Sequence, residues 1–184
     1  KAVMEHSHKA KQTWKLRALK HSPYIHGRIK MAEDLCKDGR RSAIRAVNDA
    51  FQNEVFYGVR TKMAAALGSC HTQEAEDTIV ALLQTETHSD TLCELAKAAG
   101  KHRSEQVASA LVELLQRDDL AYRARNAALL SLAKQRQFTR MDPIMYALRD
   151  DGWKHYVRKG AVIALGELQT ETAAGLLMDT LLSP

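Results

Sequence analysis

The chain has 184 residues, a formal net charge of +5 at pH 7, 45% hydrophobic residues and only 5% aromatic ones. This length allows one domain with a sizeable core, and the abundance of Ala and Leu with only three prolines favours packed helices over sheets. No apolar run is long enough to span a membrane, and no apolar segment follows a basic start as in a signal peptide. We therefore expect an all-α protein that resides in the cytoplasm.

The chain begins with a basic segment. Residues 1–30 carry eight Lys and Arg against Glu5 alone, whereas the remaining residues carry 19 basic and 21 acidic groups. The excess of positive charge therefore lies at one end of the chain. We predict a basic helix or arm over residues 1–20, which ends a preceding unit, and a single repeat domain over residues 21–184.

One phrase recurs along the rest of the chain with a period of 32 or 33 residues. An anchor residue, usually Arg, is followed by small or aliphatic residues at positions four and seven, and often by Gly at position eight. The anchors are Arg28, Arg60, Leu92, Arg125 and Arg158. Five copies in register predict a repeat architecture.

Each copy contains a second helical pattern after the first. In the first copy, Ala43, Val47, Ala50 and Phe51 share one helical face. A helix pair of this length cannot bury its apolar face alone, so neighbouring pairs must stack and share a core. We predict a right-handed α-solenoid of about five helix pairs. Its units are approximately residues 22–54, 55–86, 87–118, 119–151 and 152–184.

The connectors contain capping residues at the expected places. Thr72, Ser104 and Thr170 precede second helices and are predicted N-caps, and Pro143 falls in the first turn of its helix, where a missing N–H is harmless. The short acidic turns between units place carboxylates near the start of the next helix, where the helix dipole favours them.

The recurring arginines are predicted to have a structural role. Each lies one turn into its helix, from where the guanidinium reaches the carboxylates of the inter-repeat turn or the neighbouring repeat. This structural ladder consists of Arg28, Arg60, Arg125 and Arg158. Leu92 interrupts the ladder in the third unit. Gly68, Gly100 and Gly166 are predicted to lie at helix ends or close approaches between helices.

Binding residues are expected on the concave side of the solenoid. In helical solenoids the second helices generally line this side, so their polar positions are the candidates. The candidate residues are Arg45, Asn48, Asp77, Glu113 and Arg149.

Neither a catalytic nor a metal site is predicted for this chain. The three cysteines are widely spaced and are expected to be buried thiols, and the eight histidines include no H-E-x-x-H pair. The adjacent carboxylates Asp118-Asp119 and Asp150-Asp151 occupy matching turns, which argues for caps instead of an acid pair. We expect no enzyme activity from the chain by itself, and no cofactor in it.

The recurring phrase resembles HEAT repeats over residues 24–184. Within it, "SAIRAVNDAFQNE" and "FYGVRTKMAAALG", which together span most of residues 42–68, are similar to the C-terminal helical region of zinc aminopeptidases of the aminopeptidase N family. This resemblance implies a non-catalytic accessory domain that closes the substrate cavity, with zinc only in a catalytic domain upstream. Neither H-E-x-x-H nor the family's G-x-M-E-N phrase occurs here, so no catalytic residue is transferred.

Two further functions stay open at this stage. One is a free-standing HEAT-repeat scaffold that binds a protein partner. The other is nucleic-acid binding by the basic arm with Trp14 and Tyr24, although the repeat body is slightly acidic and has no basic stripe that follows the period. We expect a protein partner, either an upstream domain of the same polypeptide or a separate protein, and neither nucleic acid nor a membrane. HEAT-type hydroxylases hold metal with adjacent His-Glu steps, and the nearest approach here is Glu5-His6.

Overall fold

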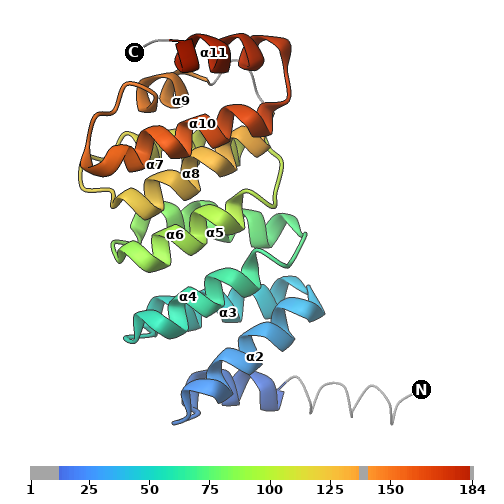
Figure 1. Ribbon diagram of the computed structural model, residues 1–184. Coiled ribbons are helices and arrows are strands. Elements are labelled where there is room, and N and C mark those ends of the chain that lie inside the picture. The colour runs from blue at the N-terminus through green and yellow to red at the C-terminus, as the bar shows by residue number, and fades with distance from the viewer. Residues whose placement is uncertain (1–12, 137–140, 183–184) are drawn as a thin grey trace.

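The computed structural model describes residues 13–136 and 141–182 and places helices along the whole of this part of the chain. No strand occurs among these residues. Of the predicted basic arm, residues 13–21 are helical, and the first 12 residues lie outside the described ones. The helices alternate between two layers of an elongated stack (Figure 1). The predicted all-α solenoid is confirmed.

The helices that carry the anchor residues form one layer, and we call them the first helices. They are α2 (Ile25–Asp38), α4 (Tyr57–Leu67), α6 (Ser89–Ala99), α8 (Tyr122–Lys134) and α10 (Tyr156–Leu168). The second helices form the other layer. They are α3 (Arg41–Asn53), α5 (Gln73–Thr85), α7 (Glu105–Leu115), α9 (Asp142–Ala147) and α11 (Glu171–Leu182). A short 3-10 turn, Trp153–His155, precedes α10.

The core runs between the two layers without interruption from unit to unit. The predicted apolar face of the first unit is buried at all of its positions, and Ala43 and Val47 have no exposed surface. In α4, Val59, Ala64 and Leu67 are equally buried. Burial of this face against the next pair is what holds consecutive units together, because the hydrophobic effect scales with the apolar area removed from water.

The predicted N-caps are confirmed. The side-chain oxygen of Thr72 accepts a hydrogen bond from Ala75 N at 3.3 Å, and Ser104 does the same for Val107 N at 3.2 Å. Pro143 lies in the first turn of α9, as expected. These caps satisfy backbone donors that a helix leaves unpaired at its start, and so help to fix where each second helix begins.

Small residues let the first helices pack closely on one another. A Cβ at Gly68 would lie 2.6 Å from the Ala98 Cβ of the next first helix, and one at Gly100 would lie 2.6 Å from the Ser131 Oγ. Both glycines follow the last residue of their helix, as predicted. The prediction for Gly166 is wrong, because this residue lies within α10 and nothing comes within 4 Å of a Cβ built on it.

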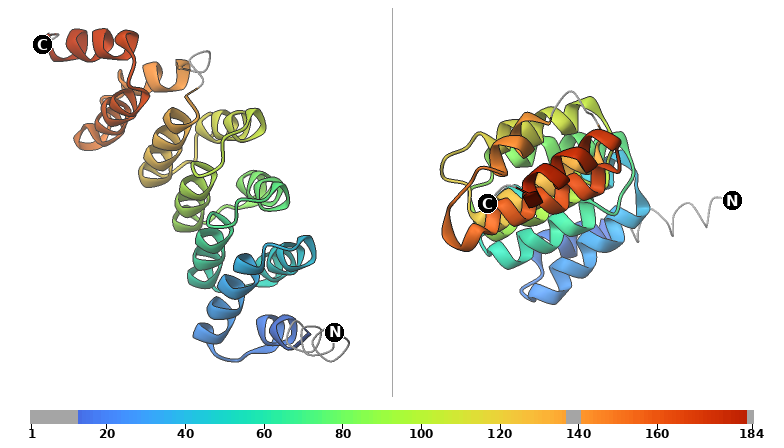
Figure 2. Two further views of the ribbon diagram at one scale, coloured as in Figure 1. Left: turned by 90° about the vertical axis from the view of Figure 1, so that its right-hand side faces the viewer. Right: turned by 45° about the horizontal axis from the view of Figure 1, so that its top comes forward.

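The stack curves gently, and the first helices lie on its inner side (Figure 2). The inner layer of a curved two-layer stack needs the shorter spacing between helices, and the glycine contacts of α4 and α6 provide it. The expectation that the second helices line the concave side is therefore wrong for this chain. The five candidates placed on that basis lie in the outer layer or just after it, and they are Arg45, Asn48, Asp77, Glu113 and Arg149.

The outer layer changes at α9, which is shorter than the other second helices and packs differently. This helix has 6 residues, whereas α5 has 13 and α7 has 11. Helix α7 packs against α5, but α9 packs mainly against α10. The turn over residues 116–121, which leads from α7 to α8, is also longer than the turns before α4 and α6. A groove opens at this place, and its lining is described below.

Candidate binding edge

The inter-repeat turns and the starts of the first helices form one long edge of the solenoid, which we call the turn edge. Arg60 joins two successive turns of this edge. Its Nε lies 2.9 Å from Glu86 Oε2, and its Nη1 donates to the carbonyl of Glu54 at 2.9 Å. Arg28 repeats this arrangement one unit earlier, with its Nε 2.7 Å from Glu54 Oε2 and its Nη1 3.0 Å from the Ser22 carbonyl. Each guanidinium thus clamps the turn before its helix to the turn after its unit.

Glu86 is the best enclosed carboxylate of these clamps, with a side chain that is 5% exposed. Its Oε1 accepts hydrogen bonds from the backbone N–H groups of Thr87 and His88, both at 2.9 Å. Burial alone would raise the pKa of Glu86, but the hydrogen bonds from His88, Arg60 and Thr87 outweigh it and lower the pKa. The ionised carboxylate therefore stabilises both Arg60 and the start of α6.

In the third unit the anchor is Leu92, and an arginine from another position takes over the role of the missing anchor arginine. Leu92 is buried, and the carbonyl of Glu86, which matches the Ser22 and Glu54 carbonyls in the other units, accepts instead from Arg117 Nη1 at 3.1 Å. Arg117 comes from the turn at the end of the unit and also pairs with Asp119 at 3.1 Å. Sequence reasoning missed this replacement because Arg117 does not share the period of the anchors.

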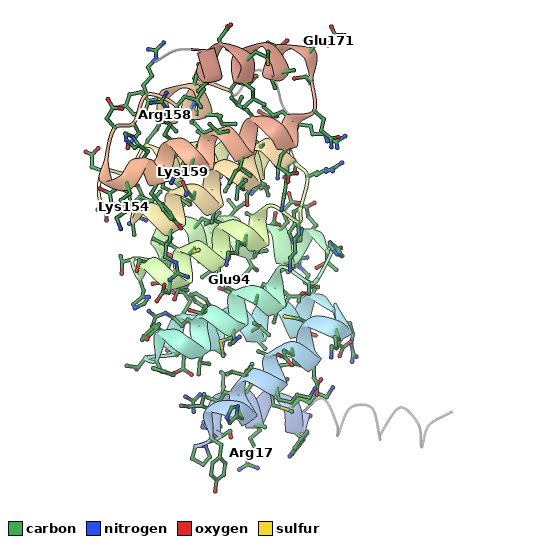
Figure 3. All side chains as sticks on the ribbon, viewed as in Figure 1. Arg17, Glu94, Lys154, Arg158, Lys159 and Glu171 are labelled. Carbon is green, nitrogen blue, oxygen red and sulfur yellow. The ribbon has the colours of Figure 1, made fainter. Side chains whose placement is uncertain are left out.

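The last two anchors behave differently from Arg28 and Arg60. Arg125 donates to two carbonyls of the preceding turn, those of Leu115 and Arg117, both at 2.9 Å. Arg158 lies on α10 (Figure 3). It is partly buried, and no hydrogen bond or ion pair joins it to another residue of the described part of the chain. The four predicted ladder arginines thus include two that pair with a carboxylate, one that binds only carbonyls and one without such a contact.

The five candidates in or after the outer layer do not converge on one site. Arg45 and Arg41 both pair with Glu74 of the next second helix, at 2.7 and 2.6 Å, and the hydrogen bond from Arg45 is the main cause of the lowered pKa of Glu74. Asp77 accepts a hydrogen bond from Gln73 of its own helix at 2.9 Å.

The other three candidates are scattered in the same way. Asn48 has its Oδ1 buried without a hydrogen-bond partner among the described residues. Glu113 accepts a hydrogen bond from Gln84 at 3.3 Å, and Arg149 is exposed after the end of α9. Glu113 thus connects two consecutive second helices, Arg149 faces the solvent, and Asn48 does neither.

Exposed aromatic side chains recur along the turn edge. They are 38% to 75% exposed, and we call this set the aromatic edge: Tyr24, Phe56, Tyr57, Tyr122 and Tyr156. The ring of Tyr57 also stacks on that of His88, with the ring centroids 4.0 Å apart. The sequence already contained this pattern of aromatic residues, since they lie two to four positions before an anchor.

The groove beside α9 lies at the turn edge and has a volume of about 920 Å³. The turn over residues 116–121 forms one wall, and α9 with Asp150 forms the opposite wall. Ala121 and Pro143 contribute apolar surface to the lining, and Tyr122 of the aromatic edge also belongs to it. Four carboxylates and two guanidinium groups line the groove, so its formal charge is negative. They belong to Asp118, Asp119, Asp142, Asp150, Arg117 and Arg125.

Residues with metal-binding or nucleophilic side chains are dispersed. Within residues 13–136 and 141–182, no three His, Cys, Asp or Glu side chains come together as a possible metal site. Cys36, Cys70 and Cys93 are buried free thiols, and burial raises the pKa of Cys36 to about 12. None of the described helices has the length and apolar character needed to cross a membrane.

Comparisons with known proteins agree with the fold. Residues 49–133, somewhat less than half of the chain, match the family model of HEAT repeats. The chain is thus an all-α solenoid whose central part is similar to HEAT repeats. No curated protein matches it.

Two solved structures illustrate the fold comparison. Human deoxyhypusine hydroxylase in complex with glycerol is similar with a TM-score of 0.65 and 17% identity, over 100% of this chain and 72% of that one. At this identity, the similarity describes the fold alone. A de novo designed 16-helix transmembrane nanopore reaches a TM-score of 0.23 at 18% identity, over 97% of this chain and 55% of that one, which is too low to support any argument.

Proposed function

We propose that this chain is a protein-binding solenoid that contacts its partner through the aromatic edge. The observation that carries the proposal is that exposed Tyr or Phe side chains lie along one edge, just before the anchor in four of the five units. Tyr and Phe are enriched in protein interfaces, where a large, rigid ring gains contact area at a small cost in side-chain entropy. A solenoid presents such side chains in a long row, which suits an extended partner surface.

The charges on the first helices favour a protein partner over nucleic acid. Within the layer of first helices, Lys30 pairs with Asp34, Lys97 with Glu94 and Arg123 with Asp90. Figure 3 shows Glu94 and Lys159 on the face of the first helices that is turned toward the viewer. Each of these three pairs places a carboxylate beside a basic group, which weakens the positive potential that would attract phosphates.

We propose no catalytic step for the chain itself. Three carboxylates of the turns already have structural contacts: Glu86 binds Arg60, Asp119 pairs with Arg117, and Asp150 accepts the Gly152 N–H at 2.8 Å. Contacts of this kind hold turns and helix starts in place.

A narrower candidate is that the partner is a zinc aminopeptidase domain of the same polypeptide. It is supported by the resemblance of residues 42–68 to the helical region of that family, and by the exposure of the aromatic pair within it, Phe56 and Tyr57. Exposed aromatic rings at this place would suit a contact with a preceding domain. Neither of the two solved structures described above is a zinc aminopeptidase.

Peptide mapping of the native polypeptide by mass spectrometry tests this narrower candidate. A segment upstream of Lys1 that contains H-E-x-x-H and a more distant Glu ligand would support it. A native polypeptide that lacks these motifs would exclude the peptidase domain as partner and leave the protein-binding solenoid.

Site-specific photo-crosslinking tests the proposed function. A photoreactive phenylalanine at Tyr57 or Tyr122 is expected to capture the same protein in cells that express the chain. Gln52 and Gln84, exposed residues of the outer layer, provide the control positions. Equal capture of that protein from the control positions, or no capture from the aromatic edge, would contradict the proposal.

A further inference from the structure

The groove beside α9 differs from the rest of the turn edge in its charge. Its two arginines are already engaged, since Arg117 binds the Glu86 carbonyl and Asp119, and Arg125 binds the carbonyls of Leu115 and Arg117. Asp118 and Asp142, in contrast, are exposed and make no hydrogen bond or ion pair with another residue of the described ranges. These two carboxylates keep their acceptor oxygens available to a bound molecule.

Apolar and aromatic side chains line the same groove as these carboxylates. Ala121 is exposed and Pro143 is partly exposed, and both line the groove. Tyr146 is 77% exposed on the α9 wall, and Tyr122 is 46% exposed on the other side. An exposed phenol ring offers its face to a Lys or Arg side chain, which adds a cation–π attraction to the ion pairs with nearby carboxylates.

We propose that this groove binds a cationic peptide segment of the partner protein. A segment that combines Lys or Arg with an aliphatic side chain matches the two kinds of surface: the cations pair with Asp118 and Asp142, and the aliphatic group covers Ala121 and Pro143. The open shape and the volume of about 920 Å³ accommodate several side chains of an extended peptide better than a single small cation. This inference rests on the proposed function and specifies the partner chemistry at one place of the turn edge.

Fluorescence anisotropy with two labelled peptides tests the charge preference. The probe is a fluorescein-labelled peptide of repeated Lys-Leu-Ser-Lys units, and its counterpart has Glu at every Lys position. We expect the Lys peptide to bind at least tenfold more tightly, and its affinity to fall as salt increases, because exposed ion pairs are screened. Equal binding of the two peptides would overturn the proposal.

Matched double variants locate the binding. D118N/D142N removes two negative charges from the groove, and D49N/D77N removes two exposed aspartates from α3 and α5. The groove variant is expected to bind the Lys peptide about five- to tenfold more weakly than the wild type, and the control variant about as tightly as the wild type. Similarly, Y146A should weaken binding severalfold, whereas M178A, which truncates a large exposed side chain on α11 outside the groove and the aromatic edge, should not.

Two outcomes separate this inference from the proposed function. If the Lys peptide binds both double variants equally, the groove assignment is wrong, while the photo-crosslinks at Tyr57 and Tyr122 still decide the proposed function. Self-association of the wild type that D118N/D142N abolishes would assign the groove to a second copy and overturn the peptide proposal. Circular dichroism melting curves for each variant show that the folded chain is being compared.

Discussion

Arg60 and Glu86 lie 26 residues apart in the chain, and their side chains meet at the turn edge with Arg60 Nε 2.9 Å from Glu86 Oε2. The contact connects the start of α4 to the end of α5, so one ion pair closes the unit formed by these two helices. The same guanidinium binds the Glu54 carbonyl of the preceding turn. Because both neighbours of Arg60 belong to turns, the stability of the turn edge should depend on it.

Loss of the guanidinium should destabilise the chain. We expect R60L to lower the free energy of unfolding by about 2–3 kcal/mol, because it leaves the buried Glu86 carboxylate without its cation. R45L is the matched control, since Arg45 is 61% exposed in its pair with Glu74, and should cost less than about 1 kcal/mol. Urea denaturation followed by circular dichroism measures both, and equal losses would show that the turn edge has no special role.

The lowered pKa of Glu86 predicts a pH dependence of stability. A carboxyl group whose pKa is lower in the folded chain stabilises it above the pKa of the unfolded chain, about 4.5. This contribution is lost as the pH falls below about 4.5 through the pKa of the folded state. We therefore expect the wild type to lose more stability than E86Q on acidification through this range. Thermal melting at a series of pH values checks it, and parallel curves for the two proteins would contradict the prediction.

The replacement of the third-unit arginine by Arg117 is also testable. R117M removes the hydrogen bond to the Glu86 carbonyl and should cost about 1 kcal/mol of unfolding free energy. D119N removes only the other partner of Arg117, an exposed carboxylate, and should have an effect close to zero. If D119N is as harmful as R117M in denaturant titrations, the surface ion pair and not the carbonyl contact is the important interaction.

Two glycines of the first helices should respond in opposite ways to alanine. G68A places a Cβ 2.6 Å from Ala98 Cβ and 2.7 Å from Ala98 Cα, so α6 must move, and we expect a loss of about 1–3 kcal/mol. G166A lies within α10 with nothing within 4 Å of the new methyl group, and should gain about 0.5–1 kcal/mol from the helix propensity of alanine. Melting temperatures of the two variants should shift in opposite directions, and a shift of G68A upward would refute the close-packing interpretation.

The period of the sequence predicted the fold because each unit repeats a similar pattern of apolar and capping residues. The apolar faces of Val47 and Phe51, and the caps at Thr72 and Ser104, depend on neighbours within one helix or one turn. Interactions at such short range join residues that are close in the chain, so they can be recognised from a single sequence.

The predicted binding residues were misplaced because the prediction depended on which layer lies inside the curve. Arg45 and Asn48 were placed on the concave side from the usual order of helices, whereas the close contact between Gly68 and Ala98 puts the first helices there. The exposed aromatic rings before the anchors, such as Tyr57 and Tyr122, were visible as a pattern, but their exposure follows only from how the turns are packed.

The sequence by itself determined the helices, their pairing, the capping residues and the period of the stack, because these follow from local propensity and from the spacing of apolar residues. Only the tertiary structure decided that Arg117 would replace the arginine missing at Leu92, and that the short α9 would leave an acidic groove beside Tyr146. Both features arise between segments that are distant in the chain. Their formation depends on the curvature and spacing of the whole stack, which no single repeat specifies.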